Sequence, residues 1–149
     1  MSLKSKVYQK CLEEVSGKIS LIQKAMKDAQ ESANSEEKST AGDKHDTARA
    51  MSHIERDMYA KQLTEAYALK KTLDAIDSTK TCESVETGAL ARTTSGTFFI
   101  SCALGKIDIE GKTVFAISPI SPMGKALLGK SKENAVEFQG RKIDILEVS

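Results

Sequence analysis

The sequence predicts an α+β protein in which two long helices form an antiparallel hairpin and a small antiparallel β domain with one short helix follows. Apolar residues recur at heptad spacing in two long segments, and after Asp77 the apolar period falls toward two. The chain has 149 residues, 5% of them aromatic, and no Trp, which is little material for one large core. We therefore expect a helical domain over residues 1–77 and a β domain over residues 80–149.

The first helix is expected over about residues 4–33. Charged and polar side chains separate its apolar residues, so most of its surface is expected to face solvent. The apolar residues follow one another at steps of four and three, the narrow seam of a coiled coil, and they are Val15, Ile19, Ile22, Met26, Ala29 and Ala33. Because the seam ends in alanines, the hairpin should narrow toward its tip.

The second helix is expected over about residues 46–77, with Asp46 as its N-cap. Its apolar stripe begins at Met51 and continues at heptad steps through Ile76. Two helices of similar length, each with one narrow stripe, favour an antiparallel hairpin. Residues 34–42 have no apolar period and are rich in Ser and Thr, so an exposed connection is expected there.

The stretch Gly42-Asp43-Lys44-His45-Asp46-Thr47-Ala48 lies where the two predicted helices meet. Asp43 and Asp46 are three residues apart, and paired carboxylates are oxygen ligands suited to a hard cation such as Mg²⁺. The alternative is that Asp46 caps the second helix and Asp43 is a turn residue. Behind this tip, one helix face carries Arg49, His53 and Arg56 at i, i+4 and i+7. These three residues form either a basic strip able to contact a phosphate backbone or an ordinary solvated face.

In the β domain, three pairs of strands are expected around turns that contain Gly96, Gly111 and Gly140. A short helix is expected with Ser121 as its N-cap, Pro122 in the first helical position and Gly129 at its end. The predicted core consists of Leu90, Phe99, Ile117, Leu127, Leu128, Val136, Ile143 and Ile145. The domain has no nucleophile–base pair and no phosphate-binding glycine loop, so it is expected to dock onto a partner and not to catalyse a reaction.

The charge balance and the cysteines narrow the classes of function. The chain has 22 basic and 21 acidic residues and a formal net charge of +1, so weak or no binding to free nucleic acid is expected. Three scattered cysteines without a CxxC pair argue against zinc and favour reduced thiols in a cytoplasmic protein. Neither a secretory signal nor an apolar stretch of about 20 residues is evident, so no membrane association is expected.

Two motifs resemble those of the bacterial Gre transcript-cleavage factors. Residues 118–130 (Ser-Pro-Ile-Ser-Pro-Met-Gly-Lys-Ala-Leu-Leu-Gly-Lys) resemble the C-terminal hallmark of that family. Residues 42–48 resemble its coiled-coil tip, Gly-Asp, two variable residues, then Glu-Asn-Ala. The motifs occur in the family's order and the resemblance covers nearly the whole chain. The chain departs from the family pattern at Asp46 in place of Glu, Thr47 in place of Asn and Ala50 in place of an aromatic residue.

The resemblance implies an FKBP-like C-terminal domain and an accessory factor of RNA polymerase that has no enzyme activity of its own. The tip would enter the secondary channel, where Asp43 and Asp46 are the implied catalytic acids. They would share Mg²⁺ with the polymerase active site, with no tightly bound cofactor, and stimulate cleavage near the 3′ end of backtracked nascent RNA. Contact with the RNA or the channel wall is implied for Arg49, His53 and Arg56, and polymerase docking for Ser121, Pro122, Lys125, Leu127, Leu128 and Gly129.

Two other functions suit the same scaffold. The first is a regulator that plugs the secondary channel without cleaving RNA, and it stays open because the changes from the family pattern lie at the tip. The second is a prolyl isomerase, which an FKBP-like domain suggests. We disfavour the isomerase because such pockets are lined with aromatic residues, whereas this domain has only Phe98, Phe99, Phe115 and Phe138, and no Trp or Tyr.

Overall fold

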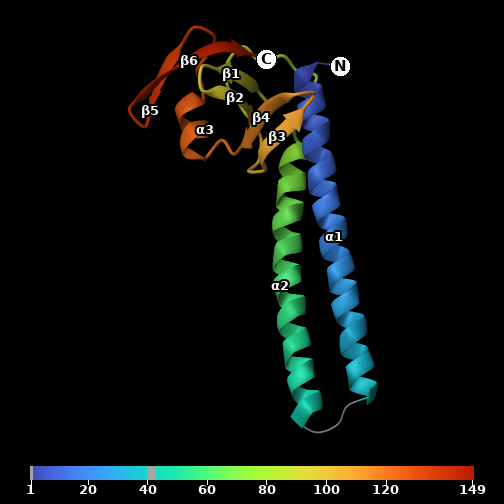
Figure 1. Cartoon of the computed structure of the whole chain (residues 1–149). Helices are drawn as coiled ribbons and strands as arrows, with labels where there is room; N and C mark the ends of the chain where they lie inside the picture. Colours follow the sequence, from blue (N-terminus) through green and yellow to red (C-terminus); the bar gives the residue numbers. More distant parts are fainter. Residues whose placement is uncertain (1, 40–42) are drawn as a thin grey trace. The chain divides into compact units, whose positions relative to one another are not determined.

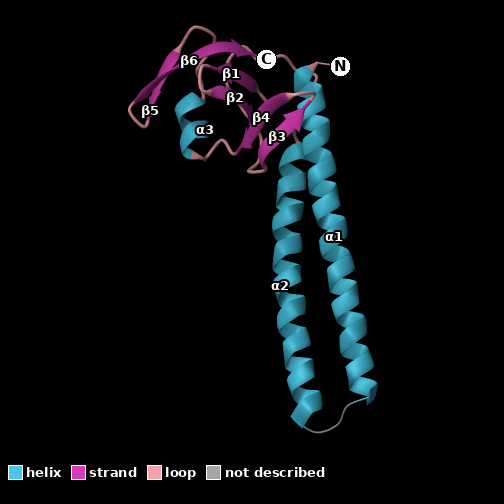
Figure 2. Ribbon diagram, viewed as in Figure 1, coloured by secondary structure: helices cyan, strands magenta, loops and turns pink. Residues whose placement is uncertain are grey.

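The computed structural model describes the backbone of residues 2–39 and 43–149, and their side chains except at positions 33–39, 43–50 and 52. The fold is α+β, as predicted (Figure 1). Helices α1 (Leu3–Ser39) and α2 (Asp43–Asp74) come first. A six-stranded mixed sheet and the short helix α3 (Pro122–Leu127) follow (Figure 2).

Both long helices differ from the prediction at the end where they are connected. Helix α1 continues to Ser39 and α2 begins at Asp43, so Asp46 is not the N-cap but lies in the first turn of α2. Glu36, Glu37 and Lys38 are good helix formers, which outweighs the Asn and Ser residues beside them. A carboxylate in a first turn is also favoured by the positive end of the helix dipole. Residues 40–42 of the predicted tip lie outside the described residues.

The chain forms two compact units. One unit consists of Met1–Glu14 and Leu69–Ser149, so it contains the first turns of α1, the end of α2 and the whole sheet. The other unit, Val15–Ala68, contains the remainder of both long helices. The domain ranges expected from the sequence, 1–77 and 80–149, stay a prediction.

In the unit Val15–Ala68 the two helices run side by side in opposite directions (Figure 1), and the Gln23 side-chain amide donates a hydrogen bond of 2.9 Å to the Tyr67 hydroxyl. Val15, Ile19 and Ala66 are buried, as the predicted seams require. The beginning of the second stripe differs, because three apolar side chains of α2 are largely exposed. The later seam positions of α1 are alanines, which offer little apolar surface to cover larger neighbours. The three exposed residues are Met51, Ile54 and Met58.

The sheet contains the three predicted hairpins, with the strand order β3-β4-β2-β1-β6-β5. The prediction of an antiparallel sheet was nevertheless wrong, because β2 and β4 pair in parallel. After β2 the chain crosses to the edge of the sheet and forms β3, which runs opposite to β2. It then turns back into β4, which lies between β3 and β2. Because β4 is antiparallel to β3, it runs in the same direction as β2. The strands are β1 (Leu90–Thr93), β2 (Gly96–Ile100), β3 (Gly105–Ile109), β4 (Lys112–Ile117), β5 (Ala135–Phe138) and β6 (Arg141–Val148).

Alternate residues of the strands face opposite sides of the sheet. On one side, Phe98 and Ile100 belong to a buried cluster with Leu127 of α3. The opposite side carries other buried residues, among them Phe99 and Val114. Most of the predicted core is buried, and Ile117 packs against the cluster while partly exposed. Leu128 was placed wrongly. It is the C-cap of α3, and at φ −52° and ψ 134° it leaves the helix and its side chain is exposed.

The ends of the long helices that share a unit with the sheet are held there by specific contacts. The Tyr8 hydroxyl donates a hydrogen bond of 2.7 Å to the Leu73 carbonyl oxygen and so joins α1 to α2. The Lys6 ammonium lies 2.9 Å from the Glu110 carboxylate in the β3–β4 turn. This hydrogen bond and the charge of Lys6 lower the pKa of Glu110. Both partners of the ion pair are substantially exposed, so it orients α1 more than it stabilises the fold.

All three cysteines are buried thiols that take part in no disulfide among the described residues. Burial, and to a lesser extent the neighbouring Cys102, raises the pKa of Cys11 to about 12. The folded-state pKa exceeds the unfolded value near 8.5, so the stability that the neutral thiol contributes is complete below pH 8 and is lost as the pH rises through 12. At pH 8 the thiolate of Cys11 would be about 10⁻⁴ of the total.

We therefore expect iodoacetamide at pH 8 to label Cys11 about a thousandfold more slowly in the native protein than in urea. The measurement is peptide mass spectrometry over a time course. The unfolded protein is the control for intrinsic reactivity. Native labelling of Cys11 within tenfold of the unfolded rate would show that the thiol is not shielded.

Candidate functional site

The predicted acidic pair lies at the start of α2. Asp43 is the first residue of the helix and Asp46 follows three positions later, a spacing that puts both positions on one helix face. This first turn comes directly after the connection from α1. The side chains of Asp43 and Asp46 are outside the described part of the chain, so their roles as metal ligands and catalytic acids stay a prediction.

The predicted basic strip is described in part. The His53 and Arg56 side chains are exposed on α2, and an Arg56 terminal nitrogen, Nη2, lies 2.8 Å from His53 Nδ1. Because a guanidinium only donates hydrogen bonds, Nδ1 accepts in this contact and the ring proton is on Nε2. The Arg49 side chain is not among those described. His53 and Arg56 therefore present one connected polar group to solvent.

The predicted docking run contains residues with different roles. The Ser121 hydroxyl accepts a hydrogen bond of 3.1 Å from the Gly124 N–H and donates one of 2.6 Å to the Ser118 carbonyl, so this side chain caps α3. Leu127 is fully buried and packs in the hydrophobic core, so its side chain offers no docking surface. Of the six predicted docking residues, the exposed ones are Pro122, Lys125, Leu128 and Gly129.

One exposed apolar residue was missed by the sequence interpretation. Ile120, between the two prolines, is 77% exposed, and Leu128 beyond the end of α3 is 37% exposed. Both belong to the run that resembles the Gre hallmark. Single exposed apolar side chains are common on protein surfaces, so the interest of Ile120 depends on its position in this run. The available signal was the Pro-Ile-Ser-Pro sequence, because a loop between prolines rarely buries its central side chain.

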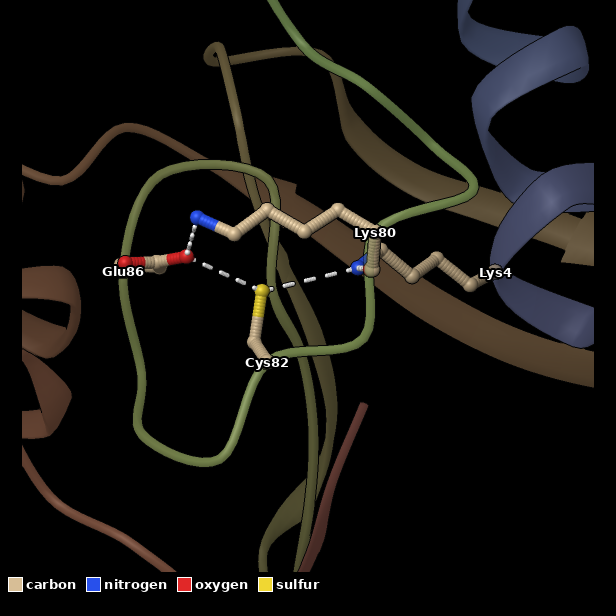
Figure 3. Close-up of polar contacts among 4 residues, drawn as sticks. All are labelled: Lys4, Lys80, Cys82 and Glu86. Carbon is tan, nitrogen blue, oxygen red and sulfur yellow. Dashed lines mark hydrogen bonds and ion pairs between the residues drawn. The ribbon is translucent and has the colours of Figure 1, made fainter.

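The sequence interpretation also missed a cluster of polar side chains formed by Lys4, Lys80, Cys82 and Glu86. The Lys4 residue in the first turn of α1 is only 4% exposed. Its ammonium donates to the Lys80 carbonyl oxygen at 2.6 Å. The same ammonium lies 3.7 Å from the Cys82 sulfur (Figure 3). The Cys82 thiol in turn donates to the Glu86 carboxylate at 3.2 Å, and the Lys80 ammonium lies 2.8 Å from the same carboxylate. The sequence signal was spacing, since Lys4, Val7 and Cys11 continue the buried face of α1 by one turn.

Hydrogen bonds and burial within this group of four side chains shift the pKa values of Glu86, Lys80 and Cys82. Hydrogen bonds from Lys80 and Cys82 hold the pKa of Glu86 below its usual range, and the hydrogen bond with Glu86 raises the pKa of Lys80. Burial raises the pKa of the Cys82 thiol, with a further increase from its hydrogen bond to Glu86. Cys82 is therefore a neutral hydrogen-bond donor at physiological pH and is not an activated nucleophile.

No protein-family model and no curated protein matches the chain. Within the residues that the structure describes, no group of three or more His, Cys, Asp or Glu side chains could hold a metal ion. Among the described helices, none combines the length and the apolar character that a membrane crossing needs.

Proposed function

We propose that the protein is a transcription elongation factor of the Gre type. It would bind RNA polymerase, insert the connected end of α1 and α2 in the secondary channel and stimulate cleavage of backtracked RNA. The observation that carries the proposal is the position of Asp43 and Asp46, three residues apart in the first turn of α2 and directly after the connection between two long helices.

The helix lengths support this proposal. With 37 and 32 residues, α1 and α2 correspond to about 55 and 48 Å at 1.5 Å per residue. Helices of this length, paired as a coiled-coil hairpin, could reach into a deep channel. The polymerase would supply the remainder of the active site, so the factor would be an accessory protein and not an enzyme.

The donor set at the proposed tip fits Mg²⁺. This ion commonly takes one or two carboxylates from a protein and keeps several water ligands, so Asp43 and Asp46 match its needs when the polymerase provides further oxygen ligands. A second Mg²⁺ beside the polymerase's own metal would activate a water for attack on the RNA phosphodiester and stabilise the leaving oxygen. Arg49 and Arg56 are suited to contact RNA phosphates from the same helix.

The region after α2 would dock on the polymerase. We propose that it has an FKBP-like fold and binds through the exposed members of the 118–130 run, with Ile120, Lys125 and Leu128 as the contact residues. The Ser121 side chain supports the conformation of this run, because it bonds the Ser118 carbonyl before α3 and the Gly124 N–H in the first turn of α3. RNA polymerase as the partner implies a cytoplasmic location in bacteria.

The direct test adds the protein to a stalled, backtracked RNA polymerase complex and measures RNA length on a gel. Cleavage stimulation would shorten the RNA at its 3′ end and restore elongation. Slower elongation with RNA of unchanged length would instead favour the channel-plugging regulator. The shorter Asp46 in place of the family's Glu is the observation that keeps this second function under consideration.

The proposal also predicts weak binding to free nucleic acid. The formal net charge is +1, so few counterions would be released from a duplex or single strand. We expect no submicromolar binding of DNA or RNA in about 150 mM salt, as measured by fluorescence anisotropy. Polymerase added to the same assay provides the positive control. A submicromolar dissociation constant for free RNA would show that the factor reaches RNA without the polymerase.

A further inference from the structure

A cavity of about 570 Å³ lies in the unit formed by Met1–Glu14 and Leu69–Ser149. The first turn of α1, the segment after α2 and strands β1, β2, β4 and β6 form its walls. Its volume falls in the range of small-molecule sites, which is roughly 300–1,000 Å³. None of the residues that line it belongs to the proposed tip or to the 118–130 run.

The walls of this cavity are cationic and rich in hydroxyl groups. Four basic residues and one acidic residue line it, and seven of the 14 lining residues are Ser or Thr. Cationic groups together with hydroxyl and backbone donors suit an anionic ligand that carries several acceptor oxygens. The start of a 37-residue helix adds the partial positive charge of its N-terminus. The basic residues are Lys4, Lys80, Arg92 and Lys112.

Lys4 provides the strongest argument for an anion. Its ammonium is buried, yet among the described residues its hydrogen-bond acceptors are a carbonyl oxygen and a thiol, and no carboxylate pairs with it. Charges taken out of water are costly unless an opposite charge compensates them. Two carboxylates interact with Lys4 from a longer range, because its charge contributes to the lowered pKa values of Glu86 and Asp77. Neither is within ion-pairing distance of Lys4, and Glu86 is already bound by Lys80 and Cys82. An anion in the adjacent cavity would add a further compensating charge.

The other three cations differ in whether they already form an ion pair. Lys80 is paired with Glu86, whereas Lys112 makes no ion pair within the described part of the chain. Arg92 is paired with Glu147 at 3.3 Å, but both side chains are more than half exposed, so this pair is weak. Arg92 and Thr97 are cross-strand partners in β1 and β2, so they lie on the same side of the sheet. Two of the four cations, Lys4 and Lys112, are thus available without breaking an ion pair.

We propose that this cavity binds a small organic phosphate, with Lys4, Arg92 and Lys112 around the phosphate and the hydroxyl-lined remainder around a polar body. The cavity is several times larger than one phosphate group, which favours a phosphate ester over the inorganic ion. Binding here requires neither the tip acids nor the polymerase. This site is therefore independent of the proposed role in transcription.

Isothermal titration calorimetry of the full-length chain with ribose 5-phosphate tests the proposal, with inorganic phosphate and unphosphorylated ribose as comparisons. We expect saturable binding of ribose 5-phosphate at one site per chain, weaker binding of inorganic phosphate and none of ribose. Lys112→Gln should weaken ribose 5-phosphate about fivefold, because one exposed charge is lost from the site. Lys112 is exposed, so the substitution leaves the core intact.

The matched control is Lys106→Gln. Lys106 lies on neighbouring β3, is also exposed and does not line the cavity, so its loss changes the net charge by the same amount. Its ion pair with Asp108, at 3.8 Å, is between exposed side chains and therefore weak. We expect its affinity to stay within twofold of wild type. The proposal is overturned if ribose 5-phosphate shows no saturable binding up to about 10 mM. It is overturned equally if the two lysine variants bind with the same affinity.

Discussion

Replacing Asp43 with Asn is expected to abolish RNA cleavage in stalled polymerase complexes and to leave polymerase binding nearly unchanged. The substitution keeps the size of the side chain but removes the negative charge that a shared Mg²⁺ requires. A lost charge interaction at a reacting centre typically costs about a hundredfold or more in rate. The measurement is the rate of 3′-end cleavage on a gel, with polymerase binding followed in parallel by competition against labelled wild type.

Asp46→Glu is the matched variant, because it keeps the charge and restores the acid of the family motif. Asp46 reaches roughly 1.5 Å less far than Glu, about one C–C bond. A displacement of about 1 Å in a catalytic site can cost on the order of a hundredfold in rate. Wild type should therefore cleave more slowly than relatives with Glu, and Asp46→Glu should cleave equally well or faster. If wild type and Asp43→Asn both fail to cleave and slow elongation equally, the protein acts as a channel plug.

Gly124→Ala is expected to destabilise the unit that contains the sheet by about 2–3 kcal/mol. In most helices this substitution is favourable by up to about 1 kcal/mol. Here a Cβ atom at position 124 would overlap the Ser118 carbonyl oxygen and lie 2.9 Å from the Ser121 hydroxyl and 3.0 Å from Pro119 Cα. Since the first contact is with backbone, the start of α3 must move and the Ser121 cap must weaken. Urea unfolding followed through amide resonances of the β strands measures the loss.

Gly17→Ala provides the opposite case in the same chain. Gly17 is exposed in the middle of α1, and a Cβ atom there would meet nothing within 4 Å. Alanine should therefore stabilise the helix by about 0.5–1 kcal/mol, through higher helix propensity and a less flexible unfolded chain. Amide resonances of α1 report this change.

Equal stability of Gly124→Ala and wild type would contradict the first of these two predictions. It would show that the loop before α3 can shift without loss of stability.

Local patterns were enough to predict most elements of this fold. The heptad seams of the two helices, the three Gly-containing hairpin turns and the Ser121–Pro122 start of α3 depend on residues close together in the chain. Their physical causes are helix periodicity, the left-handed backbone that glycine adopts and capping of free N–H groups, all of which act over a few residues. The end of α1 and the start of α2 were predicted wrongly by several residues, because helix-favouring Glu and Lys compete there with Ser and Asn.

The candidate sites differ in the same respect: the motifs could be found from local sequence patterns, whereas the cavity could not. Asp43, Asp46 and the 118–130 run were found in the sequence because a motif is a local pattern. Leu127 and Leu128 are adjacent in that run, yet the first is buried and the second exposed, since the backbone leaves the helix between them. The cavity beside Lys4 has no local pattern at all. Its walls come from the start of the chain, the segment after α2 and four strands.

The sequence is enough to predict two long helices, three β hairpins, a capped short helix and an acid pair close to the junction of the long helices. The parallel pairing of β2 and β4, the burial of Lys4 and the exposure of Met51, Ile54 and Met58 could be learned from the tertiary structure alone. The physical reason is that strand pairing and burial depend on residues far apart in the chain. Lys4 and Lys80, for example, are separated by 76 positions and meet at 2.6 Å. No periodicity within either segment specifies that contact.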